Sequence, residues 1–270
     1  MTVSELHRPI DTGEPARPPL LPAQPRRMGP VTRALVLRTI AVIAFAQAVG
    51  VVLGSHASLI LGGSLVIVAS GYSASGSVSD IPIGWQAAAT SPLWIAAVVL
   101  TWFLMRRTHA DPVAELGLRF RPVDLVIGVG GGMFIQWVVL PLLYWPIFRL
   151  SDTGADELGE AARELADTAS GSRWGALVFL VMTVLCAPIA EETIYRGVLL
   201  RGLHSFGTWG AIVLSAVAFG ALHLQGLQLP GLIAVGLICA IATKLTGRLS
   251  TAILVHATFN AITAIPLVFG

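Results

Sequence analysis

The sequence predicts an all-α protein, a polytopic integral membrane bundle of about seven helices. Of its 270 residues, 55% are hydrophobic and 12% are charged, and that charged share is about half the usual value for a soluble domain. Apolar stretches of membrane-spanning length recur throughout the chain after residue 34. This composition argues against a soluble globular protein, a disordered chain, a coiled coil and a disulfide scaffold.

The first part of the chain differs in composition from the rest. Residues 1–30 contain seven prolines together with scattered arginines and acids. Such a stretch cannot bury enough apolar surface to fold. We therefore expect residues 1–33 to form a disordered tail and residues 34–270 to form the transmembrane domain. The apolar sequence begins too late for a cleaved signal peptide.

The apolar segments give the predicted spans. A bilayer core about 30 Å thick requires roughly 20 residues of helix. The shortest segment, 57–70, is rich in glycine; it either extends the first helix after a break at Gly54 or lies at the interface. The candidate segments are 35–54, 57–70, 88–105, 123–148, 174–203, 209–226, 230–246 and 250–269.

The distribution of positive charge favours seven spans. Cytoplasmic loops of membrane proteins carry an excess of Lys and Arg. The tail has five arginines up to Arg33, the 71–87 loop has no Lys or Arg, and Arg106 and Arg107 follow the next span. Seven spans with a cytoplasmic N-terminus in the cell membrane fit this alternation. An eighth span at 57–70 would place Arg106 and Arg107 outside, although that version stays open.

The stretch 152–167 is the most polar part of the chain after the tail. Leu158, Ala161, Ala162 and Leu165 recur in it at helical spacing among acidic and basic residues. This pattern predicts a short amphipathic helix on the membrane surface. A gate over a substrate entrance is the alternative.

Two further features limit the classes of function. The net charge is only +2, so we expect no nucleic-acid partner. Cys186 and Cys239 lie inside apolar runs; we expect both to be small packing residues rather than parts of a disulfide or metal framework.

Ionisable residues inside membrane spans are costly and persist when they are paired or functional. Glu191 and Glu192 are adjacent in an apolar segment, and Arg196 follows Glu192 by four residues. Residues four apart share a helix face, so Glu192 and Arg196 can pair. Glu191 points roughly 100° away and faces a different surface.

Two other spans carry polar groups at the same spacing. Phe219 and His223 lie four apart, as do His256 and Asn260. Each pair alone is explained by contacts between helices. Together with the glutamates they supply two carboxylates, two imidazoles, an amide and a guanidinium, which are the parts of a water-activating site.

The three motifs in order resemble the CPBP family of intramembrane proteases, also called Abi or CAAX-protease-like. This family includes the Ras-converting CAAX endopeptidase. The motif region covers about residues 174–265, and Glu115 to Arg119 before a span looks like a further family feature. The resemblance implies a multi-helix membrane fold with a polar cavity and an endopeptidase activity on a membrane-associated, CAAX-type prenylated or unmodified substrate.

The resemblance also implies roles for the motif residues. Glu191 would be the general base for a water that His223 also holds, and His256 with Asn260 would stabilise the oxyanion. Glu192 and Arg196 would orient the site. No cofactor is then needed. An older view of the family as metal-dependent would make Glu191, His223 and His256 zinc ligands, a set that suits zinc chemically.

Competing peptidase classes fit the sequence less well. The sequence lacks the His-Glu-x-x-His pair of zinc proteases and the Gly-x-Gly-Asp of intramembrane aspartyl proteases. A non-catalytic scaffold, immunity or regulatory protein of the same fold is the main alternative. A transporter is disfavoured, because the first three spans carry Arg38 and Asp124 only near their ends.

Overall fold

The computed structural model describes residues 30–72, 78–107, 111–151 and 154–269. The chain divides into two units, Met1–Leu37 and Arg38–Gly270, and the contacts given below lie within the second. Helix α1 begins at Pro30. The rest of the predicted tail, residues 1–29, lies outside the described residues.

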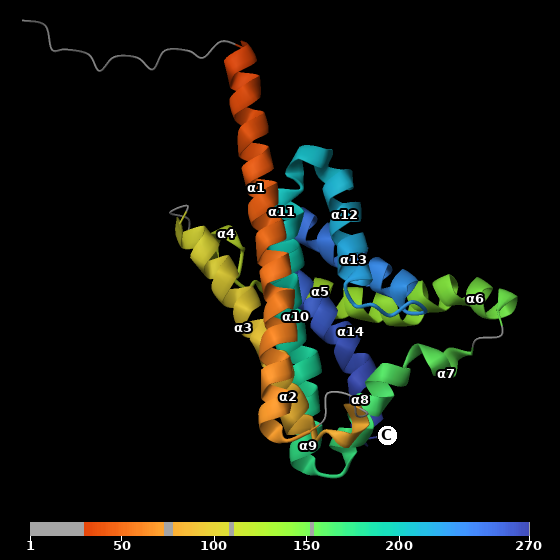
Figure 1. Cartoon of the computed structure of the whole chain (residues 1–270). Helices are drawn as coiled ribbons and strands as arrows, with labels where there is room; N and C mark the ends of the chain where they lie inside the picture. Colours follow the sequence, from red (N-terminus) through yellow and green to blue (C-terminus); the bar gives the residue numbers. More distant parts are fainter. Residues whose placement is uncertain (1–29, 73–77, 108–110, 152–153, 270) are drawn as a thin grey trace, which may run out of the picture. The chain divides into compact units, whose positions relative to one another are not determined.

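The described residues form helices, with no β-strand among them, and seven helical segments are long and apolar enough to cross a membrane (Figure 1). The predicted all-α polytopic fold with seven spans is thereby confirmed. The chain is a multi-pass membrane protein. The seven segments are Arg33–Ser70, Ile83–Arg107, Pro122–Leu150, Arg173–Gly202, His204–Ala221, Leu229–Thr246 and Leu249–Phe269.

The segment 57–70 continues the first span rather than adding an eighth. The helix is not broken at Gly54; it runs from α1 (Pro30–Ser58) through a π-helical turn, η1 (Leu59–Gly63), into α2 (Ser64–Ser70). The glycines serve packing against α3 (Ile83–Arg107), since a Cβ on Gly63 would lie 2.7 Å from the Ala89 carbonyl oxygen. The glycine-rich composition therefore reflects close helix contact.

The remaining spans are composed of several helical pieces. Two of them contain π-helical turns, the third span with η3 and the fourth with η4 and η5. The pieces are α4 (Pro112–Glu115), α5 (Pro122–Phe134), η3 (Ile135–Val139), α6 (Leu140–Leu150), α9 (Arg173–Leu180), η4 (Val181–Cys186), α10 (Ala187–Glu192), η5 (Thr193–Leu199), α11 (Leu200–Gly202), α12 (Gly207–Ala221), α13 (Leu229–Thr246) and α14 (Leu249–Phe269), with short 3₁₀ turns η2 (Val78–Asp80) and η6 (His204–Phe206).

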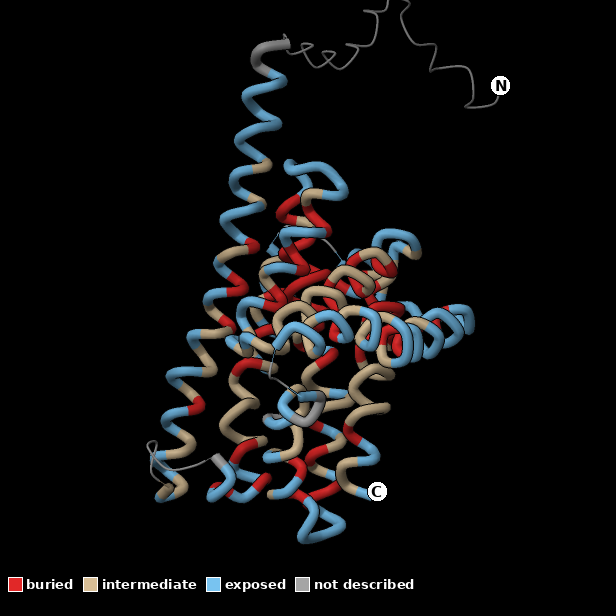
Figure 2. The backbone as a smooth tube through the Cα atoms, turned by 90° about the vertical axis from the view of Figure 1, so that its right-hand side faces the viewer, coloured by how far each residue is buried: buried red, intermediate tan, exposed pale blue. Residues whose placement is uncertain are grey.

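Large apolar side chains face outward along the spans. Leu61, Val126 and Leu142 are each more than 70% exposed, as lipid-facing residues of a membrane protein are. Buried positions gather where the helices meet one another, whereas outward turns are exposed (Figure 2). The buried set includes charged residues, among them Asp124, Glu192 and Arg196, and each of these needs a partner.

The polar stretch 152–167 contains the predicted helix, in two pieces, α7 (Ala155–Leu158) and α8 (Glu160–Ser170). Gly159 separates them. Ala166 and Ala169 of α8 are buried and pack against the fourth and last spans. Asp152 lies outside the described residues. Whether these helices lie at the membrane surface stays a prediction.

Helix α14 packs closely against α5 because three residues of α5 at the contact, Gly128, Gly131 and Gly132, are glycines. A Cβ on Gly128 would come within 2.3 Å of the Leu254 Cβ, and one on Gly132 within 2.6 Å of the Thr258 Cβ. Only glycine permits this approach of the two helices. The contact fixes the face that α14 turns toward the centre of the bundle, where His256 lies.

The start of α14 is held by a buried ion pair. Asp124 is fully buried and accepts hydrogen bonds from the Arg248 guanidinium, the closest at 2.6 Å, and from the Thr251 hydroxyl at 2.6 Å. These bonds raise the pKa of Arg248 above its ordinary value, so it stays charged. The Leu249 N–H also donates to the Leu116 carbonyl at 3.0 Å. The stretch from Glu115 to Arg119 therefore anchors the turn before α14.

We predict that Gly128→Ala and Gly132→Ala each lower the stability of the protein by about 1–3 kcal/mol, because overpacking forces α5 and α14 apart. Gly130→Ala is the matched control on the same helix, since a Cβ there meets nothing within 4 Å. The measurement is the unfolding midpoint of each purified variant in detergent. Equal midpoints for the three variants would contradict the packing described for α14.

Candidate active site

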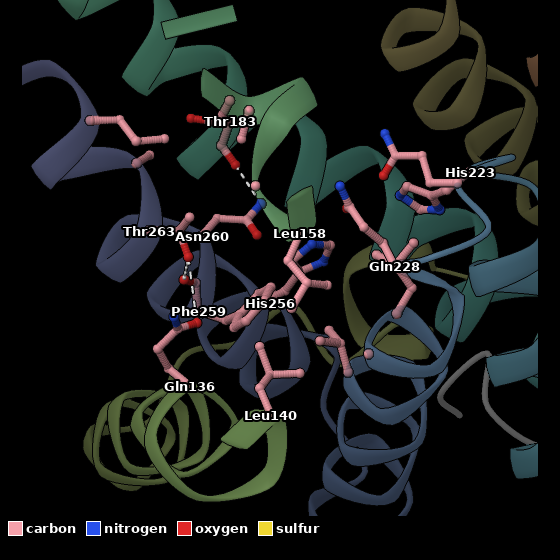
Figure 3. A pocket seen from close by; sticks show the side chains of 18 of the residues that line it. Gln136, Leu140, Leu158, Thr183, His223, Gln228, His256, Phe259, Asn260 and Thr263 are labelled. Carbon is pink, nitrogen blue, oxygen red and sulfur yellow. Dashed lines mark hydrogen bonds between the residues drawn. The ribbon is translucent and has the colours of Figure 1, made fainter. Parts of the chain in front are cut away.

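The candidate site borders a cavity of about 730 Å³. Its walls come from the η3–α6 segment, α7 and α8, the fourth span, α13, α14 and the end of α12 with the turn after it. Figure 3 shows Gln136 and Leu140 on one side, His256, Asn260 and Thr263 of α14 beside them, and His223 and Gln228 across the cavity. Most of the lining is apolar, and Glu191, His223, His256 and Asn260 all contribute to it.

The two glutamates lie in α10, a short α-helical piece between the π-helical segments η4 and η5. The last π bond of η4 runs from the Ala187 N–H to the Met182 carbonyl. The next residue, Pro188, has no N–H to give. The next carbonyl in the π register, that of Thr183, is therefore left free for another donor.

Glu192 and Arg196 form a fully buried ion pair. The Arg196 Nη1 donates to Glu192 Oε1 at 2.9 Å, and both side chains are 0% exposed. The Arg196 Nη2 donates to the Gly236 carbonyl of α13 at 2.8 Å. Glu192 Oε1 also accepts from the His256 Nδ1 at 2.9 Å. The predicted pairing of these two residues on one helix face is present, and it joins three spans.

Glu191 faces the cavity, on a different side of the helix from Glu192, as its position in the sequence predicted. Its Oε2 lies 3.7 Å from the His223 Nε2 and 3.9 Å from the His256 Nε2. The side chains of Glu191, His223 and His256 are 15%, 26% and 6% exposed. Both separations exceed a direct hydrogen bond, and a small molecule between the three groups could touch all of them.

His223 lies outside the helix that the sequence assigned to it. The predicted span 209–226 ends early, because α12 stops at Ala221 and Leu224 has a φ of 56°. The His223 Nδ1 donates to the Phe219 carbonyl at 2.7 Å, which is one of the carbonyls that the helix end leaves without a partner. The expected spacing of four still brings the Phe219 and His223 rings together, with centroids 4.7 Å apart.

Asn260 is oriented by the carbonyl that Pro188 leaves free. Its Nδ2 donates to the Thr183 carbonyl at 2.7 Å (Figure 3). An amide nitrogen carries two hydrogens, so a second N–H of Asn260 is available to the cavity that the residue lines. His256 and Asn260 thus meet at the site, as their spacing predicted, but each is fixed by a different partner.

Phe219 packs beneath the polar groups. Its ring contacts His223, His256 edge-on at 5.6 Å and Tyr195 edge-on at 5.2 Å. The Arg196 guanidinium carbon lies 4.7 Å from the same ring centre, a cation–π distance. This fully buried ring therefore packs against Arg196 and against both imidazoles and limits the rotation of the imidazoles.

Several cavity residues were not singled out from the sequence. Gln136, Tyr144, Gln228 and Arg163 line the cavity from segments far apart in the chain. Tyr144 also donates to the Leu227 carbonyl at 2.9 Å and so holds the turn after α12. Glutamine and tyrosine residues within apolar segments were the sequence feature that could have identified them. Their spacing along the chain does not show that they line the same cavity.

The alternative zinc set does not fit this arrangement. In the part of the chain that the structure describes, no group of three or more His, Cys, Asp and Glu side chains is arranged to hold a metal ion. Tetrahedral zinc at about 2 Å from each ligand keeps ligand atoms roughly 3.3 Å apart, whereas Glu191 Oε2 lies 3.7 and 3.9 Å from the two imidazole nitrogens.

The fold and the site define a class: a multi-pass membrane protein in which paired glutamates and two histidines border an internal cavity. Residues 173–262, one third of the 270-residue chain, match the family model described as type II CAAX prenyl endopeptidase Rce1-like. This match supports the predicted resemblance of the motif region to CAAX-type proteases. No curated protein and no solved structure matches the chain.

We predict that Glu192→Gln and Arg196→Met each destabilise the protein by about 3–5 kcal/mol, because each leaves one buried charged partner unpaired. The double variant should cost clearly less than the sum of the two. The measurement is a double-mutant cycle on unfolding midpoints in detergent. Additive losses would show that the pair is not coupled.

Proposed function

We propose that the protein is an intramembrane endopeptidase that hydrolyses a peptide bond of a membrane-associated substrate. The observation that carries the proposal is the position of Glu191. It is a carboxylate on the cavity wall, and its Oε2 lies 3.7 Å from the Nε2 of His223 and 3.9 Å from the Nε2 of His256. Its neighbour Glu192 is already paired with Arg196.

The hydrogen bonds define which atoms face a bound water. The His223 Nδ1 donates to a carbonyl, which can only accept, so in neutral His223 the Nε2 is an acceptor. Glu191 is an acceptor as well. A water between them donates one hydrogen to each and keeps its lone pairs for the substrate carbonyl carbon. Glu191 then takes the proton as the general base.

The remaining groups are suited to the tetrahedral intermediate. His256 donates its Nδ1–H to Glu192, so its Nε2 is left for the cavity and donates to the oxyanion when it too carries a hydrogen. Asn260 has its second N–H available beside it. Both are donors for the oxyanion. The intermediate collapses when Glu191 passes its proton to the leaving amine, which yields a free carboxylate and a free amine.

The role of Glu192 and Arg196 is to position rather than to react. They are fully buried, and Phe219 packs against Arg196 and the two imidazoles. Their bonds hold His256 and the helix that carries Glu191. The mostly apolar cavity suits a substrate with an apolar segment, and a prenylated CAAX-type tail is one such substrate. The N-terminus is proposed to face the cytoplasm, on the charge pattern of the loops.

We predict that Glu191→Gln and His223→Ala each lower cleavage by at least about 100-fold, since general acid–base groups contribute about 10²–10⁴. The assay uses purified protein in detergent with fluorogenic peptides, both farnesylated CAAX peptides and unmodified membrane-adjacent ones. Cleavage should persist with a chelator. Glu164→Gln, an exposed acid on α8 that does not line the cavity, is the control and should cleave like wild type.

Three outcomes would count against this proposal. Full activity in Glu191→Gln would show that Glu191 is not the general base. If a chelator abolished the activity and added zinc restored it, the result would show that a metal takes part in activating the water. Absence of any cleavage by correctly folded wild type would favour the non-catalytic scaffold or regulatory protein, whose motif variants lose a partner without any proteolysis.

A further inference from the structure

One amide on the cavity wall has no part in the chemistry described above. Gln136 lies in the π-helical turn η3 of the third span, where it is half-buried and lines the cavity. Turns of this kind are rare and are often found at functional sites. The Thr263 hydroxyl donates to the Gln136 Oε1 at 3.4 Å, so the oxygen of the amide is directed toward α14. Within the described ranges no hydrogen bond engages the Gln136 Nε2, and its two N–H groups are therefore available to a ligand.

Other polar side chains on this wall are already engaged by the protein. The Tyr144 hydroxyl donates to the Leu227 carbonyl at 2.9 Å. The Thr183 hydroxyl donates to the Phe179 carbonyl at 2.8 Å. A polar group beside an apolar wall costs free energy unless it finds a partner. The nitrogen of Gln136 differs from these two hydroxyls because the partner has to come from the cavity.

Helix α14 gives the position of Gln136 relative to the chemistry. His256, Asn260 and Thr263 all line the cavity, and their spacing of four and three residues puts them on one face of the helix. Figure 3 shows these three side chains on one side of the cavity together with Gln136. Thr263 follows His256 by seven residues, which is two turns or about 10 Å along the helix axis. The His256 Nε2 in turn lies 3.9 Å from the Glu191 Oε2.

The main chain of a peptide is the ligand that matches this arrangement. Each residue of a peptide carries a carbonyl, and a carbonyl without a partner in apolar surroundings costs free energy. Most of the cavity lining is apolar, so few groups on it can pair with a bound main chain. An extended chain advances about 3.3 Å per residue. The distance of about 10 Å along α14 therefore corresponds to about three residues of substrate.

We propose that Gln136 binds the main chain of the substrate: its amide N–H donates to a backbone carbonyl about three residues from the scissile bond. This rests on the proposed peptidase function and adds a substrate-binding residue outside the matched region 173–262. Thr263 orients the amide through its oxygen. Recognition at this position is then independent of the substrate side chain and depends on an extended chain with a free carbonyl.

A contact between the third and the last span is the other role that Gln136 could have. That contact uses the Oε1 and the Thr263 hydroxyl and leaves the nitrogen without a function. Removal of the amide would then lower the stability of the protein and weaken every peptide equally. Binding to one carbonyl predicts instead a loss that is confined to peptides carrying that carbonyl.

The test is a cycle between protein variants and peptide backbones. The full-length Glu191→Gln protein in detergent is titrated into fluorescein-labelled farnesylated CAAX peptides, in which a trans-alkene replaces one peptide bond at a time on either side of the cut. The alkene keeps the shape of the bond and removes its carbonyl. Mass spectrometry of the wild-type products locates the cut. We expect one replacement, about three residues from the cut, to weaken binding about 10-fold, which corresponds to about 1.4 kcal/mol.

The protein side of the cycle uses Gln136→Met, an apolar side chain of similar length. It should weaken the parent peptide about 10-fold and leave the binding of that one alkene peptide unchanged. Thr263→Val should weaken the parent peptide in the same direction by a smaller factor. Trp137→Phe is the control in the same turn and should bind like the parent protein, because Trp137 is 59% exposed and lies outside the cavity lining.

The outcomes separate this proposal from the peptidase function. Coupling at one position without any cleavage by wild type would support the main-chain site and reject the peptidase function. Cleavage by wild type with additive losses at every position would support the peptidase function and overturn the role of Gln136, as would coupling only at a bond next to the cut. Equal weakening of all peptides with a lower unfolding midpoint in Gln136→Met would assign the residue to the contact between spans.

Discussion

The fully buried ion pair of Glu192 and Arg196 is the constraint on which the site depends. Two desolvated charges are costly unless hydrogen bonds compensate them. The carbonyl of Gly236 in α13 and the imidazole of His256 in α14 supply two such bonds, while Glu192 Oε2 and Arg196 Nε have no partner among the described residues. Three spans are therefore fixed relative to the same two side chains. Because Glu191 is adjacent to Glu192 on the helix, its direction into the cavity is fixed by the pair as well.

Helix α14 is placed by backbone features as much as by side chains. Gly128 and Gly132 allow it to approach α5, and the Asp124–Arg248 pair holds its first turn. Farther along, the Thr183 carbonyl, which Pro188 leaves without a donor, binds Asn260. These three contacts fix the helix near its start, along its packed face and beside the cavity. The two polar residues of its motif are thus held in position before a substrate arrives.

The sequence was informative wherever a local rule applied. Hydrophobic length gave eight candidate segments and the distribution of positive charge favoured seven spans. Helical spacing predicted the pairing of Glu192 with Arg196, and the three motifs located the matched region. It failed where the outcome depends on contacts between distant segments. The end of α12 before His223 depends on a turn held by Tyr144, and the place of Arg163 in the cavity depends on how α8 packs. No periodicity encodes either.

The partial exposure of Glu191 distinguishes it from the other glutamate of its motif. A carboxylate as deeply buried as Glu192 needs a permanent cation, and that cation would occupy the atoms needed for chemistry. A fully exposed carboxylate would be solvated by water, and no protein group would fix its orientation. At 15% exposure, Glu191 faces two imidazoles at distances too long for direct bonds. These distances leave room for the bridging water of the proposed mechanism, and Phe219 packs against both imidazoles and Arg196.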